Sequence, residues 1–282
     1  MEGAYGCVLR PAVCNKNKSV GMVSKAFDRL ENLEDEYQSH KRLNLKSIPN
    51  YKQYYITDPE KCQLDEPIHC KNISTSMVLN YLDGGRTLKN ILEQERDPTW
   101  VLKGLSNIFY GVMLMNGLQR YHLDIKPDNI VLDDAGQFRL IDFGFSKNLN
   151  SSMSEIGNPN YDHAYEYWPF EMGTLNNFNG VVTNKYLKGY LSILNDEFVT
   201  LRKKEIVLHT DIFPLVITPE MIYNKADVWG LGLTLCKVYE ALSKTSPIRT
   251  ALLECIKKLL IFNPLERPEA AKAYKIYKRL SI

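Results

Sequence analysis

The sequence has no apolar run long enough to cross a bilayer, which would need about 20 consecutive apolar residues. It also has no large excess of charge of either sign: 35 lysines and arginines stand against 33 aspartates and glutamates, and the formal net charge is +2. Residues 1–11 lack the basic start and apolar stretch of a signal peptide. We therefore expect a cytoplasmic protein that binds neither a membrane nor nucleic acid.

Cysteine is sparse and scattered. The residues form no C-x-x-C pair, and we expect reduced thiols, as in a cytosolic compartment. Cys62, His69 and Cys70 could suggest a metal site, but three ligands at this spacing fit no closed zinc pattern. The six cysteines are Cys7, Cys14, Cys62, Cys70, Cys236 and Cys255.

The order of the local patterns predicts the fold class. Residues 4–27 indicate two short strands around a polar turn, and residues 76–79 indicate a buried strand. Apolar residues have helical spacing over 28–45, whereas residues 47–72 are mixed and rich in turns. Beyond residue 215 the pattern is mainly helical. Strands early and helices late predict an α+β protein with two lobes.

Two further signals lie in the middle of the chain. Asp97 as an N-cap and Pro98 at the first helical position predict the start of a long helix. Residues 130–132 and 138–141 flank the turn sequence Asp-Asp-Ala-Gly, which predicts a β-hairpin.

The segment 121–129, YHLDIKPDN, is the most informative part of the sequence, and Asp142-Phe143-Gly144 follows the hairpin. Phosphoryl transfer needs hard oxygen ligands for the metal ions that neutralise a triphosphate, and Asn129 and Asp142 could supply them. Asp124 would orient the attacking hydroxyl and accept its proton. Lys126 would offset the charge on the γ-phosphate. This stretch resembles the catalytic loop and metal-binding motif of eukaryotic-type protein kinases.

The resemblance extends toward the N-terminus. Residues 3–8, GAYGCV, resemble the later part of the glycine-rich loop, which implies that Gly3, Gly6 and Val8 lie over the ATP phosphates. Val23-Ser24-Lys25 resembles the end of the VAIK strand, so Lys25 would bind the α- and β-phosphates. Glu36 would pair with Lys25, and Glu34 is an alternative for that role.

Residues 77–85 resemble the strand and hinge that hold adenine. The resemblance implies that Leu79 is the gatekeeper at the back of the pocket. It also implies that the backbones of Asn80 and Leu82 hydrogen-bond the purine edge.

Three later motifs complete the resemblance. Residues 168–171, WPFE, resemble the APE motif, and residues 227–232, DVWGLG, resemble the DxWxxG motif of the central helix of the large lobe. Asp227 would brace the catalytic loop through its backbone amides. Residues 263–268 resemble the late motif whose arginine pairs with the APE glutamate, so we expect a buried ion pair between Arg267 and Glu171.

The resemblance covers residue 3 to about 280 and implies one kinase domain over 1–282. Its parts would be a small lobe over 1–80, a hinge over 81–85 and a large lobe over 86–282. Between the APE and DxWxxG motifs the chain is longer than in typical members, which indicates an insertion at about 175–220. This insertion could shape the substrate groove or dock a partner, or it could be an elaborated surface loop.

Three departures from the family pattern bear on activity. Met1 stands in the place of the first glycine and most of the first strand is absent, so either the start is placed too late or the phosphate lid is shortened. Leu123 replaces the arginine that usually reads a phosphate on the activation loop, so we expect activity that does not need that switch. Ala164 replaces a threonine that serine/threonine kinases usually have near the APE motif.

The resemblance implies a serine/threonine protein kinase that uses ATP with Mg²⁺, or alternatively Mn²⁺, and acts on protein substrates as a monomer. The choice of serine and threonine rests on Lys126, because tyrosine kinases usually have a different pattern there. The chain is also similar to kinases carried by large cytoplasmic DNA viruses, which would place it in the host cytoplasm. Two alternatives stay open: a pseudokinase that serves as a scaffold, and a small-molecule kinase of the aminoglycoside or choline type.

Overall fold

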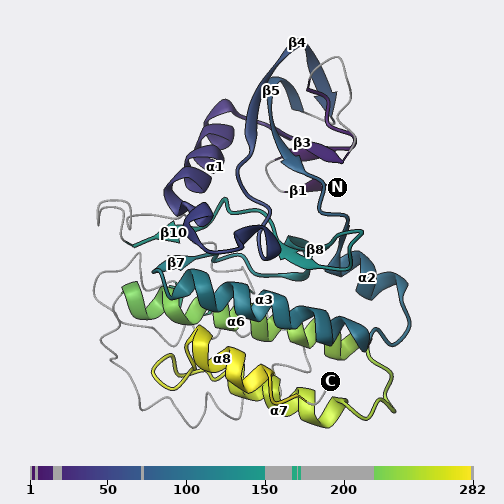
Figure 1. Cartoon of the computed structure of the whole chain (residues 1–282), viewed down its shortest axis with the longest axis vertical. Helices are drawn as coiled ribbons and strands as arrows, with labels where there is room; N and C mark the ends of the chain where they lie inside the picture. Colours follow the sequence, from purple (N-terminus) through teal and green to yellow (C-terminus); the bar gives the residue numbers. More distant parts are fainter. Residues whose placement is uncertain are drawn as a thin grey trace, which may run out of the picture.

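The computed structural model describes residues 2–3, 6–14, 21–70, 73–149, 167–169, 171–172 and 219–280. Figure 1 shows a sheet-rich N-terminal part above a helical C-terminal part, so the predicted α+β fold with two parts is confirmed. Among these residues no helix is both long and apolar enough to span a membrane. The predicted insertion lies outside the described residues except for the start of the helix at Pro219, and Met1 and Ala164 lie outside them too.

The described N-terminal strands form a five-stranded antiparallel sheet in the order β1-β2-β3-β5-β4. The sequence did not predict β4, because charged residues and Pro67 interrupt its alternation and a register shift separates Gln63 from Ile68. β5 continues through Leu82, two residues into the predicted hinge. The strands are β1 (Glu2–Gly3), β2 (Gly6–Leu9), β3 (Met22–Phe27), β4 (Glu60–Cys70) and β5 (Ile73–Leu82).

Helix α1 (Leu30–Leu43) packs on one face of this sheet. Its Leu33 lies against Phe27 of β3 and Leu79 of β5 in a small apolar cluster. The same helix carries Glu36 toward the sheet, where the side chain is buried. Asn44 ends the helix in a left-handed conformation, with φ of 43°. The helix is thus fixed by apolar contacts on the side that carries its buried carboxylate.

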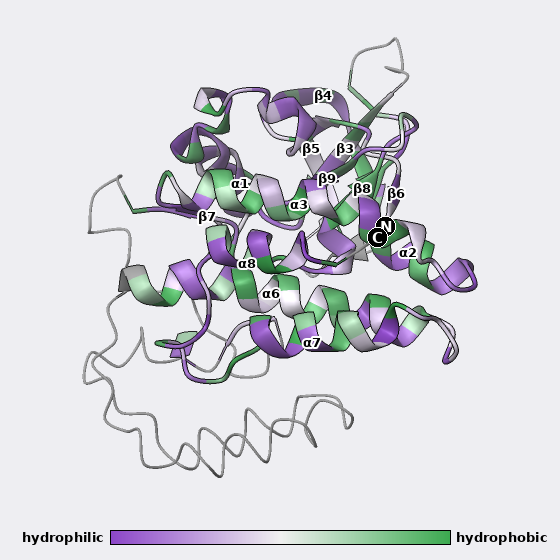
Figure 2. Cartoon of the chain, turned by 60° about the horizontal axis from the view of Figure 1, so that its bottom comes forward, coloured by the Kyte–Doolittle hydropathy of each residue, from purple (hydrophilic) through white to green (hydrophobic). Residues whose placement is uncertain are grey.

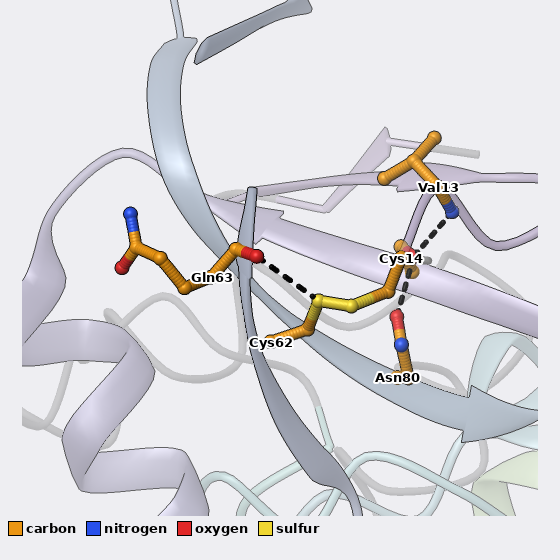
Figure 3. Close-up of a disulfide and its surroundings, with 6 residues drawn as sticks. Val13, Cys14, Cys62, Gln63 and Asn80 are labelled. Atoms are coloured by element: carbon orange, nitrogen blue, oxygen red, sulfur yellow. Dashed lines mark hydrogen bonds between the residues drawn. A yellow bond between two sulfur atoms is a disulfide. The ribbon is translucent and has the colours of Figure 1, made fainter. Parts of the chain in front are cut away.

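Two disulfides cross the outer face of the sheet and join Cys7 to Cys70 and Cys14 to Cys62. In a flat sheet two intervening strands would hold β2 and β4 about 14 Å apart, yet the Cα atoms of the two pairs are 6.6 and 6.1 Å apart. The β4–β5 hairpin must therefore curve over β2 and the segment after it. Figure 3 shows the Cys14–Cys62 link beside Val13 and Asn80.

These links contradict the expectation that all six cysteines are reduced. Sequence separations of 63 and 48 residues gave no sign of the pairing, because it depends on how the hairpin curves. Cys236 and Cys255 are free and buried. The cysteines therefore no longer support the argument for a reducing compartment.

The C-terminal part is built around α6 (Pro219–Ala241), whose described residues are buried along almost their whole length. Figure 2 shows that the helices around it carry both apolar and polar residues. Trp229 of α6 joins the large core that these helices share. The other helices are α2 (Leu88–Gln94), α3 (Trp100–Asn116), α7 (Arg249–Leu259) and α8 (Ala270–Tyr277).

Helix α3 begins later than predicted. Its N-cap is Thr99, so the assignment of Asp97 as the cap is wrong. The Asp97 carboxylate instead accepts a hydrogen bond from the backbone N–H of Ser243, at 3.0 Å. The Asp97 carboxylate, which the local pattern assigned to the start of α3, is therefore used in a contact with a residue far along the chain.

Short strands and single turns connect the two parts. The predicted hairpin is present, as β8 and β9, and β6 pairs with β8 on its other side. A second small sheet pairs β7 with β10. These elements are β6 (Arg86–Thr87), β7 (Arg120–Tyr121), β8 (Ile130–Leu132), β9 (Phe138–Leu140), β10 (Lys147–Asn148), and the 3₁₀ turns η1 (Leu45–Ser47), η2 (Tyr51–Gln53) and η3 (Pro127–Asn129).

Reduction of the disulfides should lower the free energy of unfolding by about 2–4 kcal/mol for each link, because each closes a long loop in the unfolded chain. Urea unfolding with and without dithiothreitol measures this loss. A variant with serine at the four linked positions should not respond to the reductant. The pairing would be refuted if the oxidised protein released six reactive thiols on unfolding rather than two.

Candidate active site

The predicted catalytic loop follows β7 and has a strained backbone that side chains from other elements hold in place. Leu123 has φ of 61°, a left-handed conformation that is uncommon for a bulky residue. The backbone N–H groups of His122 and Leu123 donate to the Asp227 carboxylate, at 3.0 and 2.7 Å. Asn116 donates to the same carboxylate at 2.8 Å. Asp227 thus makes the bracing contacts expected of it.

Glycine in α6 lets that helix approach the loop closely. A Cβ atom on Gly230 would lie 2.8 Å from the carbonyl oxygen of Ile125, a separation that real Cβ atoms essentially never show. Since Asp227 lies one turn earlier on the same helix, the small residue and the carboxylate together set how near the loop sits to α6.

His122 is buried and links the loop to Ile141, the residue before Asp142. Its Nε2 lies 3.0 Å from the carbonyl oxygen of Ile141, and its Nδ1 lies 3.2 Å from the backbone nitrogen of Asp124. Burial lowers the pKa of His122 below its ordinary value, so the neutral ring donates through Nε2 and accepts through Nδ1. This histidine therefore holds backbone groups in place and has no spare proton to transfer.

Asp124, Lys126 and Asn129 converge at the floor of the site. The Asn129 amide donates to the Asp124 carboxylate at 2.6 Å and to the Asp124 carbonyl at 2.9 Å. The Lys126 ammonium lies 3.0 Å from the same carboxylate oxygen, Oδ2. The Asp124 side chain is only 2% exposed, so its orientation is fixed by two donors in a largely dry environment.

Lys25, Glu36 and Asp142 form a second cluster from three separate elements. The Lys25 ammonium lies 2.7 Å from Glu36 Oε2 and 3.1 Å from Asp142 Oδ1. Burial alone would lower the pKa of Lys25, but the two carboxylates raise it above its ordinary value. Lysine therefore stays charged, and Glu36 rather than Glu34 is its partner; Glu34 instead pairs with Lys61 on the surface.

The two carboxylates of this cluster differ in electrostatic character. Burial raises the pKa of Glu36 above its ordinary value in spite of Lys25. Burial also acts to raise the pKa of Asp142, but Lys25 and Lys126 outweigh it and hold that pKa below its ordinary value. Asp142 has φ of 62° and is the more exposed of the two. Asp142 thus offers a charged carboxylate oxygen, a possible metal ligand, at the open side of the cluster.

The described part of the glycine-rich segment lies next to Lys25. Val8 of β2 is opposite Lys25 of β3, and Gly3 of β1 is opposite Gly6 of β2. A Cβ atom on Gly6 would lie 2.4 Å from the carbonyl oxygen of Ala26, so only glycine fits there. Strand β2, with Gly6 and Val8, therefore lies directly beside the strand that carries the lysine.

The register of β5 changes the assignments made for residues 79–82. Asn80 is paired with Ser24 of β3 on one side and Glu60 of β4 on the other. Its backbone groups face one neighbouring strand or the other, so the expectation that they bind the purine edge is wrong. The Asn80 side chain instead accepts from Ser24, at 2.5 Å. Leu82 is paired with Met22 of β3 but with no residue of β4, and its backbone remains a candidate for binding the purine edge.

Tyr81 was missed from the sequence and contacts the charged cluster. Leu79 is opposite Lys25, fully buried against Phe27 and the apolar face of α1. Tyr81, two residues later on the same face, places its hydroxyl 2.5 Å from Glu36 Oε1. Period-two alternation from Leu79 could have found Tyr81, although alternation alone does not say which residue reaches Glu36. Tyr81 therefore contacts the Lys25–Glu36 pair through Glu36, and the assignment of Leu79 as the gatekeeper stays a prediction.

Leu123 lies in an apolar cluster with Trp168, and no arginine stands at this position of the loop. The cluster also includes Tyr121, Met172, Ile222, Tyr223 and Ala226. The Trp168 indole N–H donates to the Leu123 carbonyl at 2.6 Å, and its ring meets Phe145 edge-on at 5.5 Å between centroids. Both backbone polar groups of the strained Leu123 are thus satisfied by side chains, from Asp227 and Trp168.

The predicted ion pair between Arg267 and Glu171 is present. Both side chains are fully buried, and the guanidinium contacts both carboxylate oxygens. Arg267 also donates to the carbonyls of Ile261 and Phe262, at 2.9 and 3.1 Å. The planar guanidinium of Arg267 therefore donates hydrogen bonds to several acceptors, and these bonds offset the free-energy cost of removing the charged group from water.

The residues of the site fit a magnesium ion with a nucleotide triphosphate. Asp142 offers a partly exposed, charged carboxylate. The amide nitrogen of Asn129 donates a hydrogen bond to Asp124, so the amide oxygen of Asn129 points away from Asp124. Carboxylate and amide oxygens are the hard ligands that Mg²⁺ prefers. Cys62 and Cys70, by contrast, belong to two different disulfides and cannot hold a metal ion as thiolates.

Comparison with known proteins identifies the family. The family model described as the protein kinase domain matches residues 2–171, which is more than half of the chain. The chain therefore belongs to the protein kinase family.

Relatives in several organisms agree with this membership. The chain is similar to cAMP-dependent protein kinase type 3 of Saccharomyces cerevisiae, with 26% identity over 163 residues, 51% of this chain and 37% of that protein. It is 29% identical over 168 residues to the probable serine/threonine-protein kinase mkcD of Dictyostelium discoideum, a match that covers 57% of this chain and 24% of that protein. It is 31% identical over 153 residues to mouse cyclin-dependent kinase-like 4, a match that covers 52% of this chain and 41% of that protein. The chain thus matches less than half the length of each relative.

Removal of one partner of the Arg267–Glu171 pair should cost about 3–5 kcal/mol, because the other charge stays buried without a counter-ion. Glu171→Gln tests this in urea unfolding, with Glu254→Gln as the matched control. Glu254 pairs with Lys257 on the surface at 2.8 Å, and loss of such an exposed pair should have a much smaller effect on the free energy of unfolding. Equal costs for the two variants would show that burial of the first pair is energetically irrelevant.

Proposed function

We propose that the chain is a serine/threonine protein kinase that transfers the γ-phosphate of ATP to protein hydroxyls. The observation that carries the proposal is a pair of clusters joined through the backbone: Asp124 with Lys126 and Asn129, and Lys25 with Glu36 and Asp142. The Asn129 carbonyl accepts from the N–H of Ile141, the residue before Asp142, at 3.0 Å. Phosphoryl transfer relies on positioning and charge stabilisation, and these clusters provide both.

Asp124 is the group proposed to face the substrate hydroxyl. Its carboxylate orients that hydroxyl and accepts its proton as the oxygen attacks phosphorus. Lys126 lies on the same carboxylate, so its ammonium is beside the point where the transferred phosphate passes and balances the charge that develops there.

Lys25 is proposed to bind the α- and β-phosphates, with Glu36 fixing its direction. Asn129 and Asp142 would hold Mg²⁺, which neutralises phosphate charge when bound. Gly6 and Val8 lie beside the lysine strand and would cover the phosphates. Leu82 would contribute its backbone to the adenine at the hinge.

The finer parts of the proposal rest on the sequence and the relatives. Serine and threonine specificity is supported by Lys126 and by the similarity to the probable serine/threonine-protein kinase mkcD of Dictyostelium. We also propose that the whole chain forms one kinase domain, acts as a monomer in the cytoplasm and takes protein substrates. The complete set of six charged and amide groups favours catalysis over a scaffold role.

Asp124→Asn and Asp142→Asn should each reduce the transfer of labelled phosphate to a generic basic protein by at least about 100-fold, because each removes a charge needed at the reacting centre. Asp134→Asn is the matched control: it removes an exposed carboxylate in the turn between β8 and β9. The measurement is incorporation from labelled ATP, followed by phosphoamino-acid analysis.

Label on serine and threonine is the expected result. Activity of Asp142→Asn equal to wild type would refute catalysis at this site. Labelled free metabolite with no labelled protein would favour a small-molecule kinase, and label on tyrosine alone would overturn the specificity.

Activity should depend on Trp168 and not on a phosphate in the chain, because the indole satisfies the Leu123 carbonyl where the family usually has an arginine. Trp168→Phe should lower kcat about fivefold to tenfold through loss of this hydrogen bond. Trp100→Phe is the control, since it removes an exposed indole bond to Glu95. Phosphatase treatment of wild type should leave the rate within about twofold. A larger loss would show that a phosphate is needed.

A further inference from the structure

The Glu36 carboxylate has a separate donor on each oxygen. Lys25 contacts Oε2 at 2.7 Å, and the Tyr81 hydroxyl donates to Oε1 at 2.5 Å. A carboxylate held by a single ammonium can turn about its side chain, whereas two donors on opposite oxygens fix its plane. The second donor comes from β5 rather than from the strand that carries the lysine.

We propose that Tyr81 is a positioning residue that fixes the Glu36 carboxylate and, through it, the Lys25 ammonium that faces the nucleotide. The inference rests on the proposed function and names a residue that acts on the same site without touching the reacting atoms. It predicts that the hydroxyl of Tyr81, and not merely its ring, contributes to nucleotide binding.

The need for a second donor follows from the charges around Lys25. Its one ammonium is shared between Glu36 and Asp142, so neither carboxylate is fully compensated by it. Glu36 is also the more buried of the two. A buried carboxylate with an unsatisfied oxygen is costly, and the phenol supplies the missing hydrogen bond without adding charge.

The Tyr81 hydroxyl is itself held from behind by α1. His40 Nε2 lies 3.3 Å from the phenol oxygen, and His40 Nδ1 lies 2.8 Å from the Thr57 hydroxyl. Burial lowers the pKa of His40 to about 3, and Lys25 acts in the same direction. The neutral ring donates from Nε2 to the phenol and accepts at Nδ1 from Thr57, which leaves the phenol hydrogen for Glu36.

The same network reaches the segment that carries Asp142. The Phe143 ring packs edge-on against His40, with 5.4 Å between centroids. Helix α1, strand β5 and the Asp142-Phe143 segment therefore meet at one point. Any rotation of α1 that moved Glu36 away from Lys25 would also break the Tyr81 hydrogen bond, so the phenol favours the arrangement in which the ion pair is formed.

The test is Tyr81→Phe, which keeps the ring and removes the hydroxyl. The dissociation constant of magnesium-ATP, measured by calorimetry, and the KM for ATP should each rise about tenfold, in line with loss of a hydrogen bond to a charged group. Tyr37→Phe is the matched control: Tyr37 follows Glu36 on α1, and its ring contacts the surface lysines Lys41 and Lys61. It should leave both constants unchanged.

A pH profile separates positioning from general packing. The groups that act on Glu36 are Lys25, Asp142 and Tyr81, and the neutral His40 contacts the Tyr81 hydroxyl. Burial already raises the pKa of Glu36, and the Tyr81 hydrogen bond opposes that rise. Its removal should raise the pKa further, so the acidic limb of kcat/KM for ATP should move to higher pH in Tyr81→Phe and stay in place in Tyr37→Phe.

A double-mutant cycle with Glu36→Gln completes the experiment. If Tyr81 acts through Glu36, Tyr81→Phe should have little further effect on ATP binding once the carboxylate is gone. Additive losses in the cycle, or unchanged binding and pH profile in an active Tyr81→Phe enzyme, would overturn the inference. Wild type that binds ATP about tenfold better than Tyr81→Phe but transfers no phosphate would uphold it and reject the proposed function. Absence of ATP binding by wild type would reject both.

Discussion

One ammonium group holds the site together. Lys25 contacts Glu36, 11 residues away in α1, and Asp142, 117 residues away beyond the β8–β9 hairpin. The sheet, the helix and the segment that carries Asp142 keep their relative positions because each contributes one member of this cluster. A charge shared between two carboxylates in a partly buried setting is sensitive to geometry, which explains why further donors surround it.

The loop after β7 is also held from outside, by hydrogen bonds from side chains to its backbone. A leucine in a left-handed conformation would be unfavourable in isolation, yet Asp227 binds its N–H and Trp168 binds its carbonyl. The apolar side chain then packs where a charged one would need a counter-ion. The loop is therefore held by the folded C-terminal part itself, and its order does not require an added charge.

Much of this arrangement could be predicted from local sequence. The spacing of Asp124, Lys126 and Asn129, and the later Asp142, indicated a shared site because short motifs have a fixed local geometry. The Arg267–Glu171 pair joins residues 96 positions apart, and it was predicted from the family resemblance of the two motifs rather than from local geometry. The register of β5 could not be predicted in this way. A shift of two residues keeps the side chains on the same face, so the alternating pattern could not decide whether Leu79 or Tyr81 contacts Glu36. The cysteine pairs depend on the curvature of a hairpin, which no single segment encodes.

The cross-links on the outer face change how the sheet can open. In an uncross-linked sheet a strand near the edge frays by itself, with a small local free energy. Here β2 is covalently joined to the far side of the sheet, so it cannot separate unless the curved hairpin swings away with it. Local fluctuations of β2 thereby become part of one larger cooperative motion of the whole N-terminal sheet.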